Sequence, residues 1–242
     1  NNIQVGGLLF SGLLISSLGA VMDVAMSVSS SMQEICRQNE KISCREYHVC
    51  RVLKKHGINN TMMTGDPAWF DLDYIGNKMR RPSRINKLVF TPPLSAYYEE
   101  QAKDIIRMLS KLFPDAEKFC TFHLADAITR PLSEGEKSDN SVAMNMEVAE
   151  KNERIRKVAR EEGFKIVLAS HDIKKIDFYQ ECDLHVGYEC HAHWAFIRKR
   201  IPSVLIAEDA RGVGFIYTQG FMGFEGFVRC QNPQCDNTRP TN

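Results

Sequence analysis

Histidines and cysteines gather in one thirteen-residue stretch, CDLHVGYECHAHW, which runs from Cys182 to Trp194. Zinc accepts both kinds of side chain, so the composition of this stretch raises the question of a metal site. In a strand, however, Cys182 and His185 are an odd number of residues apart and point to opposite faces. A closed tetrahedral site would need the backbone to rearrange, and we therefore predict no metal here.

His191 offers a different chemistry, because it stands where a predicted strand, LHVGY, gives way to a predicted helix, HAHWAFIRKR. The N-terminus of a helix carries unpaired N–H groups and a partial positive charge, which suit a phosphate or a carboxylate. An imidazole at that place can donate a hydrogen bond or transfer a proton near neutral pH. The alternative is a histidine that only begins the helix.

A second polar string, AEDARGVG, follows the last predicted strand. Glu208 and Asp209 end that strand, and Arg211 and Gly212 are expected in a turn. Arg211 suits bidentate recognition of a carboxylate or phosphate, although it could equally pair with Glu208 or Asp209. The chain has no GxGxxG, Walker loop, GxSxG elbow or HExxH helix, which disfavours dinucleotide enzymes, P-loop NTPases and α/β-hydrolases.

Short apolar runs alternate with longer helical patterns between residues 84 and 228. The predicted strands are Lys87–Thr91, KFCTFHLA, KIVLAS, DLHVGY and SVLIAED, and the predicted helices include one capped by Ser95 and one from Val142 to Glu162. This alternation indicates an α/β fold: a Rossmann-like parallel sheet with flanking helices. Ligands of such sheets bind beyond the carboxyl ends of the strands, which draws attention to Thr91, His123, residues 170–172, 189–193 and 208–211.

The first 35 residues differ in character from the rest, because Asp23 is the only charged residue before Gln33. Residues 5–22 are apolar or small, and a helix of that length approaches the thickness of a bilayer core, so we predict an apolar helix ahead of the α/β fold. Residues 5–34 resemble one segment of the YibE/F family of multi-span membrane proteins. One span does not reproduce a multi-span protein, and no transport function follows.

Charge and cysteine usage narrow the functional classes further. Thirty-one basic residues against thirty acidic ones give a net charge of +1, which offers no basic surface for nucleic acid. The charged run from Glu147 to Glu162 is typical of a solvated helix face. Eight cysteines without a CxxC pair are expected as reduced thiols. We expect a cytoplasmic protein, with membrane association through residues 5–28 as the open alternative.

Several strings, in this order, resemble the polysaccharide pyruvyl transferase family over about residues 43–214: SCREYHVCRVLKKHGI, TGDPAWFDLD, LVFTPP and FYQECDLHVGYECHAHWAFIRKRIPSVLIAEDARGVG. The resemblance implies a GT-B-like fold of two Rossmann-type domains, of which this chain holds the C-terminal half. It implies phosphoenolpyruvate as the donor substrate, a sugar of a cell-surface polysaccharide as the acceptor, and no further cofactor.

The same resemblance assigns roles to individual residues. His191 matches the histidine of the family's Arg-x-His motif and is the expected catalytic acid or base. Glu189 stands where the family has the arginine, which reverses the charge beside an anionic substrate. Arg211, His193 and His123 are expected to line the same substrate pocket together with Glu189.

The resemblance also divides the chain. Residues 36–83 correspond to a remnant of a first Rossmann-like domain, residues 84–228 to the pyruvyl transferase domain, and residues 229–242 to a polar tail. Two other functions stay open: a non-catalytic, membrane-anchored binding module, and a GT-B glycosyltransferase that uses a nucleotide sugar.

Overall fold

The computed structural model describes residues 41–123, 140–170, 172–220, 223–228 and 239–240. Within it the chain forms two compact units, residues 1–65 and 66–242. The predicted apolar helix and the residues matched to a membrane span lie outside the described part. Among the helices that the structure describes, none is both long and apolar enough to cross a membrane.

The described part of the first unit is a small βαβ element. Strand β1 (Ile42–Cys44) and strand β2 (Thr61–Met63) pair in parallel, and helix α2 (Tyr47–Lys55) connects them. The helix is amphipathic, and Leu53 and Cys50 bury its apolar side against β1. Gly57 follows the helix with a φ of +80°, a conformation that favours glycine. The two strands were not predicted from the sequence.

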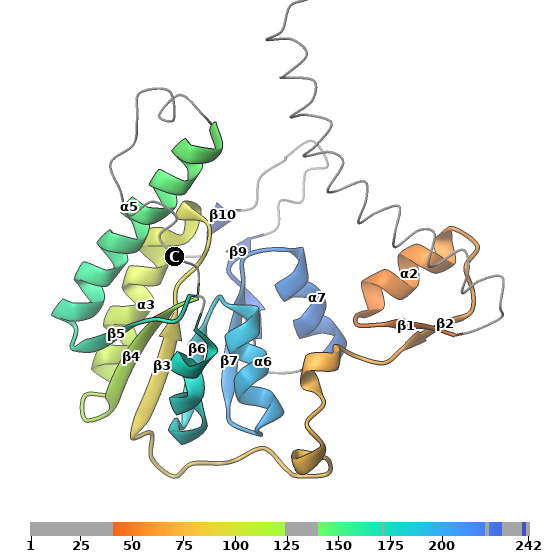
Figure 1. The fold of residues 1–242 in the computed structure, drawn as a ribbon, viewed down its shortest axis with the longest axis horizontal. Helices are drawn as coiled ribbons and strands as arrows, with labels where there is room; N and C mark the ends of the chain where they lie inside the picture. The colour runs from red at the N-terminus through yellow and green to blue at the C-terminus, as the bar shows by residue number, and fades with distance from the viewer. Residues whose placement is uncertain (1–40, 124–139, 171, 221–222, 229–238, 241–242) are drawn as a thin grey trace, which may run out of the picture. The chain divides into compact units, whose positions relative to one another are not determined.

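A six-stranded, fully parallel sheet forms the centre of the second unit (Figure 1). Its strands are β3 (Lys87–Thr91), β4 (Glu117–Phe122), β5 (Phe164–Leu168), β6 (Leu184–Gly187), β7 (Ser203–Ala207) and β8 (Gly223–Glu225). Their order across the sheet is β5-β4-β3-β6-β7-β8. Strands β4 and β5 follow β3 outward on one side, and strands β6, β7 and β8 follow outward on the other side of β3. The Rossmann-like α/β architecture predicted from the sequence is thereby confirmed.

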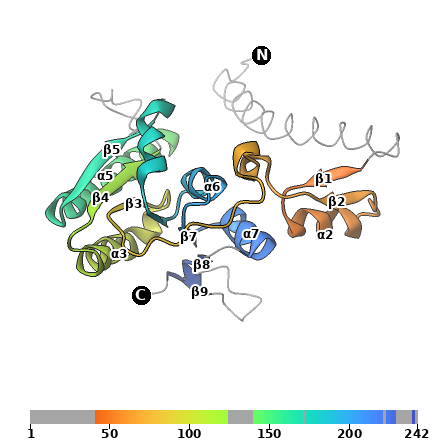
Figure 2. The same ribbon diagram turned by 90° about the horizontal axis from the view of Figure 1, so that it is seen from below.

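Two layers of helices cover the sheet, because alternate residues of each strand face opposite sides. Leu88 and Phe90 of β3 pack with helices α3 (Glu99–Leu112) and α5 (Asn140–Glu161). Val89 packs on the other side with the 3-10 segment η4 (Ile173–Glu181) and helix α6 (Cys190–Arg198). Helix α7 (Ala210–Gln219) joins α6 there through Phe215 and Trp194. Both views show α3 and α5 side by side (Figures 1 and 2).

Short 3-10 segments connect these elements: η1 (Pro67–Trp69), η2 (Leu72–Tyr74) and η3 (Ala96–Tyr98). Ser95 accepts the N–H of Tyr97 and caps η3, as expected for the start of this helical stretch. Strands β9 (Phe227–Val228) and β10 (Arg239–Pro240) form a separate antiparallel pair.

Residues 66–83 belong with the second unit, although the resemblance grouped them with residues 36–65. The Trp69 ring meets Trp194 of α6 edge to face, with centroids 6.2 Å apart. Asp71 is buried and lies 2.8 Å from the Lys199 ammonium just beyond that helix. This segment therefore packs against α6.

Candidate functional site at the carboxyl edge of the sheet

The order of the strands changes direction between β3 and β6, which are neighbours in the sheet but not in the sequence. Parallel α/β sheets bind ligands beyond the carboxyl ends of the strands at such a switch point. Here the loop of residues 92–95 leaves β3, and Tyr188 and Glu189 leave β6. His123 leaves β4 on one side, and Glu208 leaves β7 on the other.

Glu189 and His191 form a carboxylate–imidazole pair at the start of α6. Glu189 Oε1 lies 2.6 Å from His191 Nδ1 and also accepts the backbone N–H of His191 at 3.2 Å. Glu189 is thus the N-cap of the helix and the partner of the ring. Its side chain is 21% exposed, whereas that of His191 is 82% exposed. A ring held in this way through Nδ1 presents its Nε2 edge outward.

The close approach of β6 to β3 sets the position of this pair. Tyr188 donates its N–H to Thr91 O at 3.0 Å, and Glu189 donates its N–H to Thr91 Oγ1 at 3.3 Å. A Cβ at Gly187 would overlap the backbone and hydroxyl of Thr91, so only glycine fits there. The last residue of β3 therefore fixes where α6 begins.

His123 lies at the end of β4 and is held by a buried tyrosine. Its Nε2 is 2.8 Å from the Tyr179 hydroxyl. Burial lowers the pKa of His123, and the charge of Glu189 opposes this effect while that of His191 adds to it. His123 and Glu189 both line one recess. Burial also raises the pKa of Tyr179, so its hydroxyl stays protonated and can donate.

The recess beside these groups is narrow, with a volume of about 20 Å³ and room for little more than one water molecule. It is lined by the loop after β3, the end of β4, one side of α5 and the start of α6: Pro92, Pro93, Leu94, Thr121, Phe122, His123, Val148, Lys151, Asn152 and Glu189. Lys151 is almost fully buried, and its ammonium donates to Pro93 O and to Leu94 O, the latter at 2.9 Å.

Glu208 holds the same loop from the β7 side. Its two carboxylate oxygens accept the N–H groups of Leu94 at 2.9 Å and Ser95 at 3.0 Å. Burial raises the pKa of Glu208, although these two hydrogen bonds and the charge of Lys151 favour its ionised form. The first loop beyond the switch point is therefore fixed at both its carbonyl and its amide groups.

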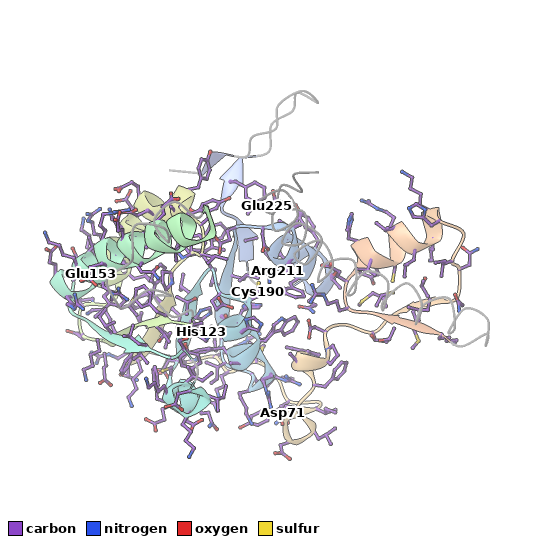
Figure 3. The ribbon with its side chains drawn as sticks, turned by 45° about the horizontal axis from the view of Figure 1, so that its top comes forward. Asp71, His123, Glu153, Cys190, Arg211 and Glu225 are labelled. Atoms are coloured by element: carbon purple, nitrogen blue, oxygen red, sulfur yellow. The ribbon has the colours of Figure 1, made fainter. Side chains whose placement is uncertain are left out.

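Arg211 lies in the first turn of α7, where the sequence had suggested a turn instead of a helix. Asp209 caps this helix, accepting the N–H groups of Arg211 and Gly212 at 2.9 and 3.0 Å. The Arg211 guanidinium is 2.7 Å from the same carboxylate. Arg211 lies near Cys190 of α6 in Figure 3, where burial raises the pKa of that thiol and the charge of Arg211 opposes this larger effect. Arg211 was expected either to bind an anion or to pair with Glu208 or Asp209, and in the structure it pairs with Asp209.

His193 lies apart from the other predicted site residues. Its ring is 1% exposed and its Nδ1 is 2.7 Å from Ser203 Oγ, inside the layer between α6 and the sheet. Burial lowers the pKa of His193 to about 4. The structure thus brings His123, Glu189, His191 and Arg211 to the carboxyl edge and places His193 beneath it.

Two groups that shape this edge, Lys151 and Tyr179, were not predicted from the sequence. The charged run from Glu147 to Glu162 was expected to be a solvated face, yet Lys151, Asn152 and Arg156 are buried. A lysine among many charged residues carries no signal of burial, because its surroundings come from a distant loop. Among the residues that the structure describes, no three His, Cys, Asp or Glu side chains are arranged to hold a metal ion.

The family model for YibE/F-like proteins matches residues 1–50, which is 50 of the 242 residues. This match confirms the resemblance of the N-terminal stretch, and most of it lies outside the described residues. No curated protein matches the chain. The match does not extend to the α/β unit, whose function therefore rests on its own geometry.

Proposed function

We propose that residues 84–228 are a polysaccharide pyruvyl transferase-like domain, the C-terminal half of a GT-B-like fold, that binds phosphoenolpyruvate at the carboxyl edge. The observation that carries this proposal is the pair of Glu189 and His191, with 2.6 Å between Oε1 and Nδ1, at the switch point of the sheet. A carboxylate that holds one nitrogen of an imidazole orients the ring and favours proton uptake at the other.

Ketal formation requires such a group to accept protons from the sugar hydroxyls and to donate a proton to the product. Two hydroxyls of the acceptor sugar bond to the central carbon of phosphoenolpyruvate, the carbon–oxygen bond to phosphate breaks, and phosphate leaves. Of the two hydroxyl protons, one goes to the methylene carbon, which becomes a methyl group, and the other leaves with phosphate. His191 is the proposed acceptor and donor of these protons, because its ring is exposed at the edge.

His123 and Arg211 are the proposed substrate contacts. His123 is held through Nε2 by Tyr179, so its other nitrogen is available to a ligand. Arg211 would contact the anion after exchanging part of its bond to Asp209. His193, buried against Ser203, supports the start of α6 from below and is not proposed as a contact.

One observation favours a second function, a non-catalytic binding module anchored through residues 5–28. The cations described near this edge are engaged within the protein: Lys151 with two carbonyls and Arg211 with Asp209. Glu189 adds a negative charge where the resembled family has an arginine. A strongly anionic donor is then bound weakly, and a neutral sugar would be favoured at this edge.

Calorimetric titration of the full chain with phosphoenolpyruvate tests the proposal. Saturable binding is expected, and His191→Ala should weaken it at least tenfold without unfolding the protein, since that side chain is largely exposed. His48→Ala is the matched control, because His48 is an exposed histidine in the first unit. Binding that is absent, or equal in His191→Ala and the wild type, would rule out the transferase. Binding of the acceptor sugar without binding of phosphoenolpyruvate would support the non-catalytic binding module instead.

A further inference from the structure

A chain of buried hydroxyl and imidazole groups runs beneath the Glu189–His191 pair. Thr91 Oγ1 is 2.9 Å from His185 Nε2, and His185 Nδ1 is 2.7 Å from Ser203 Oγ. The same Ser203 oxygen is 2.7 Å from His193 Nδ1. None of the four side chains is more than 4% exposed. The chain thereby joins β3, β6, β7 and α6 through hydrogen bonds that water does not reach.

The number of available hydrogens decides which group donates and which accepts in each of these hydrogen bonds. Ser203 has a single hydroxyl hydrogen and two imidazole neighbours, so it donates to one ring and accepts from the other. At the far end, Thr91 Oγ1 already accepts the N–H of Glu189. If His185 also donated to Thr91, the buried hydroxyl hydrogen of Thr91 would meet no acceptor among the described residues. Such a buried, unsatisfied donor is costly.

We infer that the chain runs in one direction, with Thr91 donating to His185, His185 to Ser203, and Ser203 to His193, and that His185 is a positioning residue for the site. His185 accepts a hydrogen bond from the Thr91 hydroxyl. This orients the hydroxyl so that a lone pair of its oxygen faces the Glu189 amide. That bond fixes the first turn of α6, which carries Glu189 and His191. The positioning role rests on the proposed function, whereas the direction of the chain does not.

The direction requires both rings to be neutral, since a protonated His185 would donate at both nitrogens and reverse the bond to Thr91. Burial lowers the pKa of both histidines, that of His193 to about 4. The stacking of the His185 ring on Phe196, with centroids 5.1 Å apart, holds the ring in the plane that this arrangement needs.

Nitrogen-15 NMR of the full chain, labelled at histidine, tests the direction without any substitution. Imidazole nitrogen shifts distinguish the two neutral tautomers. We expect the hydrogen on Nδ1 in His185 and on Nε2 in His193. The opposite tautomer at either ring would overturn the inferred direction.

Two substitutions at position 185 test the positioning role. His185→Phe keeps the contact with Phe196 but removes both polar bonds, and it should speed hydrogen exchange of the Glu189 amide at least tenfold. It should also weaken phosphoenolpyruvate binding at least fivefold. His185→Gln keeps one acceptor and one donor and should recover most of both losses. A variant that fails to fold is recognised by circular dichroism, and Thr91→Val then replaces it as the test of the Glu189 amide.

The outcomes separate this role from the proposed function. If His191→Ala abolishes binding while His185→Phe changes neither binding nor exchange at Glu189, the positioning role is wrong and the proposed function stands. If the wild-type chain binds no phosphoenolpyruvate, the proposed function is lost. The histidine tautomers and the hydrogen-exchange rate of the Glu189 amide still decide whether the hydrogen-bonded chain of Thr91, His185, Ser203 and His193 orders the start of α6.

Discussion

Lys151 and Glu208 hold one loop from opposite sides, although they are 57 residues apart in the sequence. The Lys151 ammonium donates to the carbonyl groups of Pro93 and Leu94, and the Glu208 carboxylate accepts the N–H groups of Leu94 and Ser95. The carbonyl and amide groups of this loop are thus satisfied by one buried side chain, Lys151, and one half-buried side chain, Glu208. This arrangement makes the loop a rigid wall of the recess.

Replacing Lys151 by methionine should destabilise the protein by about 2 kcal/mol, because buried carbonyl groups then lose their donor. Lys157→Met is the matched control, since Lys157 is exposed on the same helix and its loss should change stability by less than about 0.5 kcal/mol. Urea unfolding of both variants measures the difference. Equal midpoints for the two would show that the Lys151 bonds contribute nothing net.

A methyl group at position 187 should disturb the switch point itself. Gly187→Ala places a Cβ against the backbone and hydroxyl of Thr91, and β6 must then move away from β3. We expect a loss of about 2 kcal/mol or more, as for other overpacked cores. Gly76→Ala is the comparison, because Gly76 has a φ of +80° but open space around it. It should cost about 1 kcal/mol, from backbone strain alone.

Thermal unfolding of the two glycine variants compares these costs directly. A Gly187→Ala protein no less stable than Gly76→Ala would mean that the strands tolerate a wider spacing. The backbone bonds from Tyr188 and Glu189 to Thr91 would then not be what places α6.

The sequence predicted the sheet of the second unit well, because its central strands carry their own signal. Lys87–Thr91 was predicted with the same bounds as β3, and the helix expected from Val142 to Glu162 is α5, Asn140–Glu161. Parallel strands buried on both faces read as continuous apolar runs, so local composition suffices. The gathering of His123 and Glu189 at one edge followed from topology alone.

The parts that the sequence did not predict depend on distant partners. Strands β1 and β2 have three residues each, too few for a periodic pattern. Arg211 was expected in a turn because Gly212 and Gly214 follow it closely. Asp209 caps a helix there, and Gly212 is needed because a Cβ would crowd Ala207. His193 was expected at the site because it follows the predicted strand DLHVGY, but its ring is buried between α6 and β7.

The two buried histidines should make the protein sensitive to mild acid. A folded-state pKa below the unfolded value near 6.5 means that the unfolded chain takes up protons first as the pH falls. The contribution is fully present above pH 6.5 and is lost as the pH falls towards the folded value, about 4 for His193. Between pH 7 and pH 5, His193 alone should cost about 2 kcal/mol, and His185 acts in the same direction.

Unfolding in urea at pH 7 and pH 5 measures this loss, and His193→Gln should remove the part that belongs to His193. Glu208 works against it, because burial raises its folded pKa and the folded protein therefore takes up a proton at Glu208 more readily than the unfolded chain does as the pH falls. Glu208→Gln should therefore steepen the loss between pH 7 and pH 5. A wild-type protein equally stable at both values, with Glu208→Gln also unchanged, would contradict the burial of neutral imidazoles.

The charge at position 189 should decide how strongly the edge binds an anion. Glu189→Arg replaces a negative by a positive charge beside the site, and phosphoenolpyruvate affinity should rise at least tenfold, since the reversal is worth a few kcal/mol at about 4 Å even with strong screening. Glu189→Gln removes the charge but keeps an oxygen that can accept the His191 N–H, and it should give a smaller gain.

Calorimetry on the three proteins orders these affinities, and pyruvyl transfer separates binding from chemistry. If His191 needs its carboxylate, Glu189→Arg binds the donor more tightly yet transfers no faster than the wild type, because the partner of Nδ1 is gone. If both binding and transfer rise in Glu189→Arg, the imidazole works without the carboxylate. Affinities that do not follow the order Arg above Gln above Glu would place the anion elsewhere on the molecule.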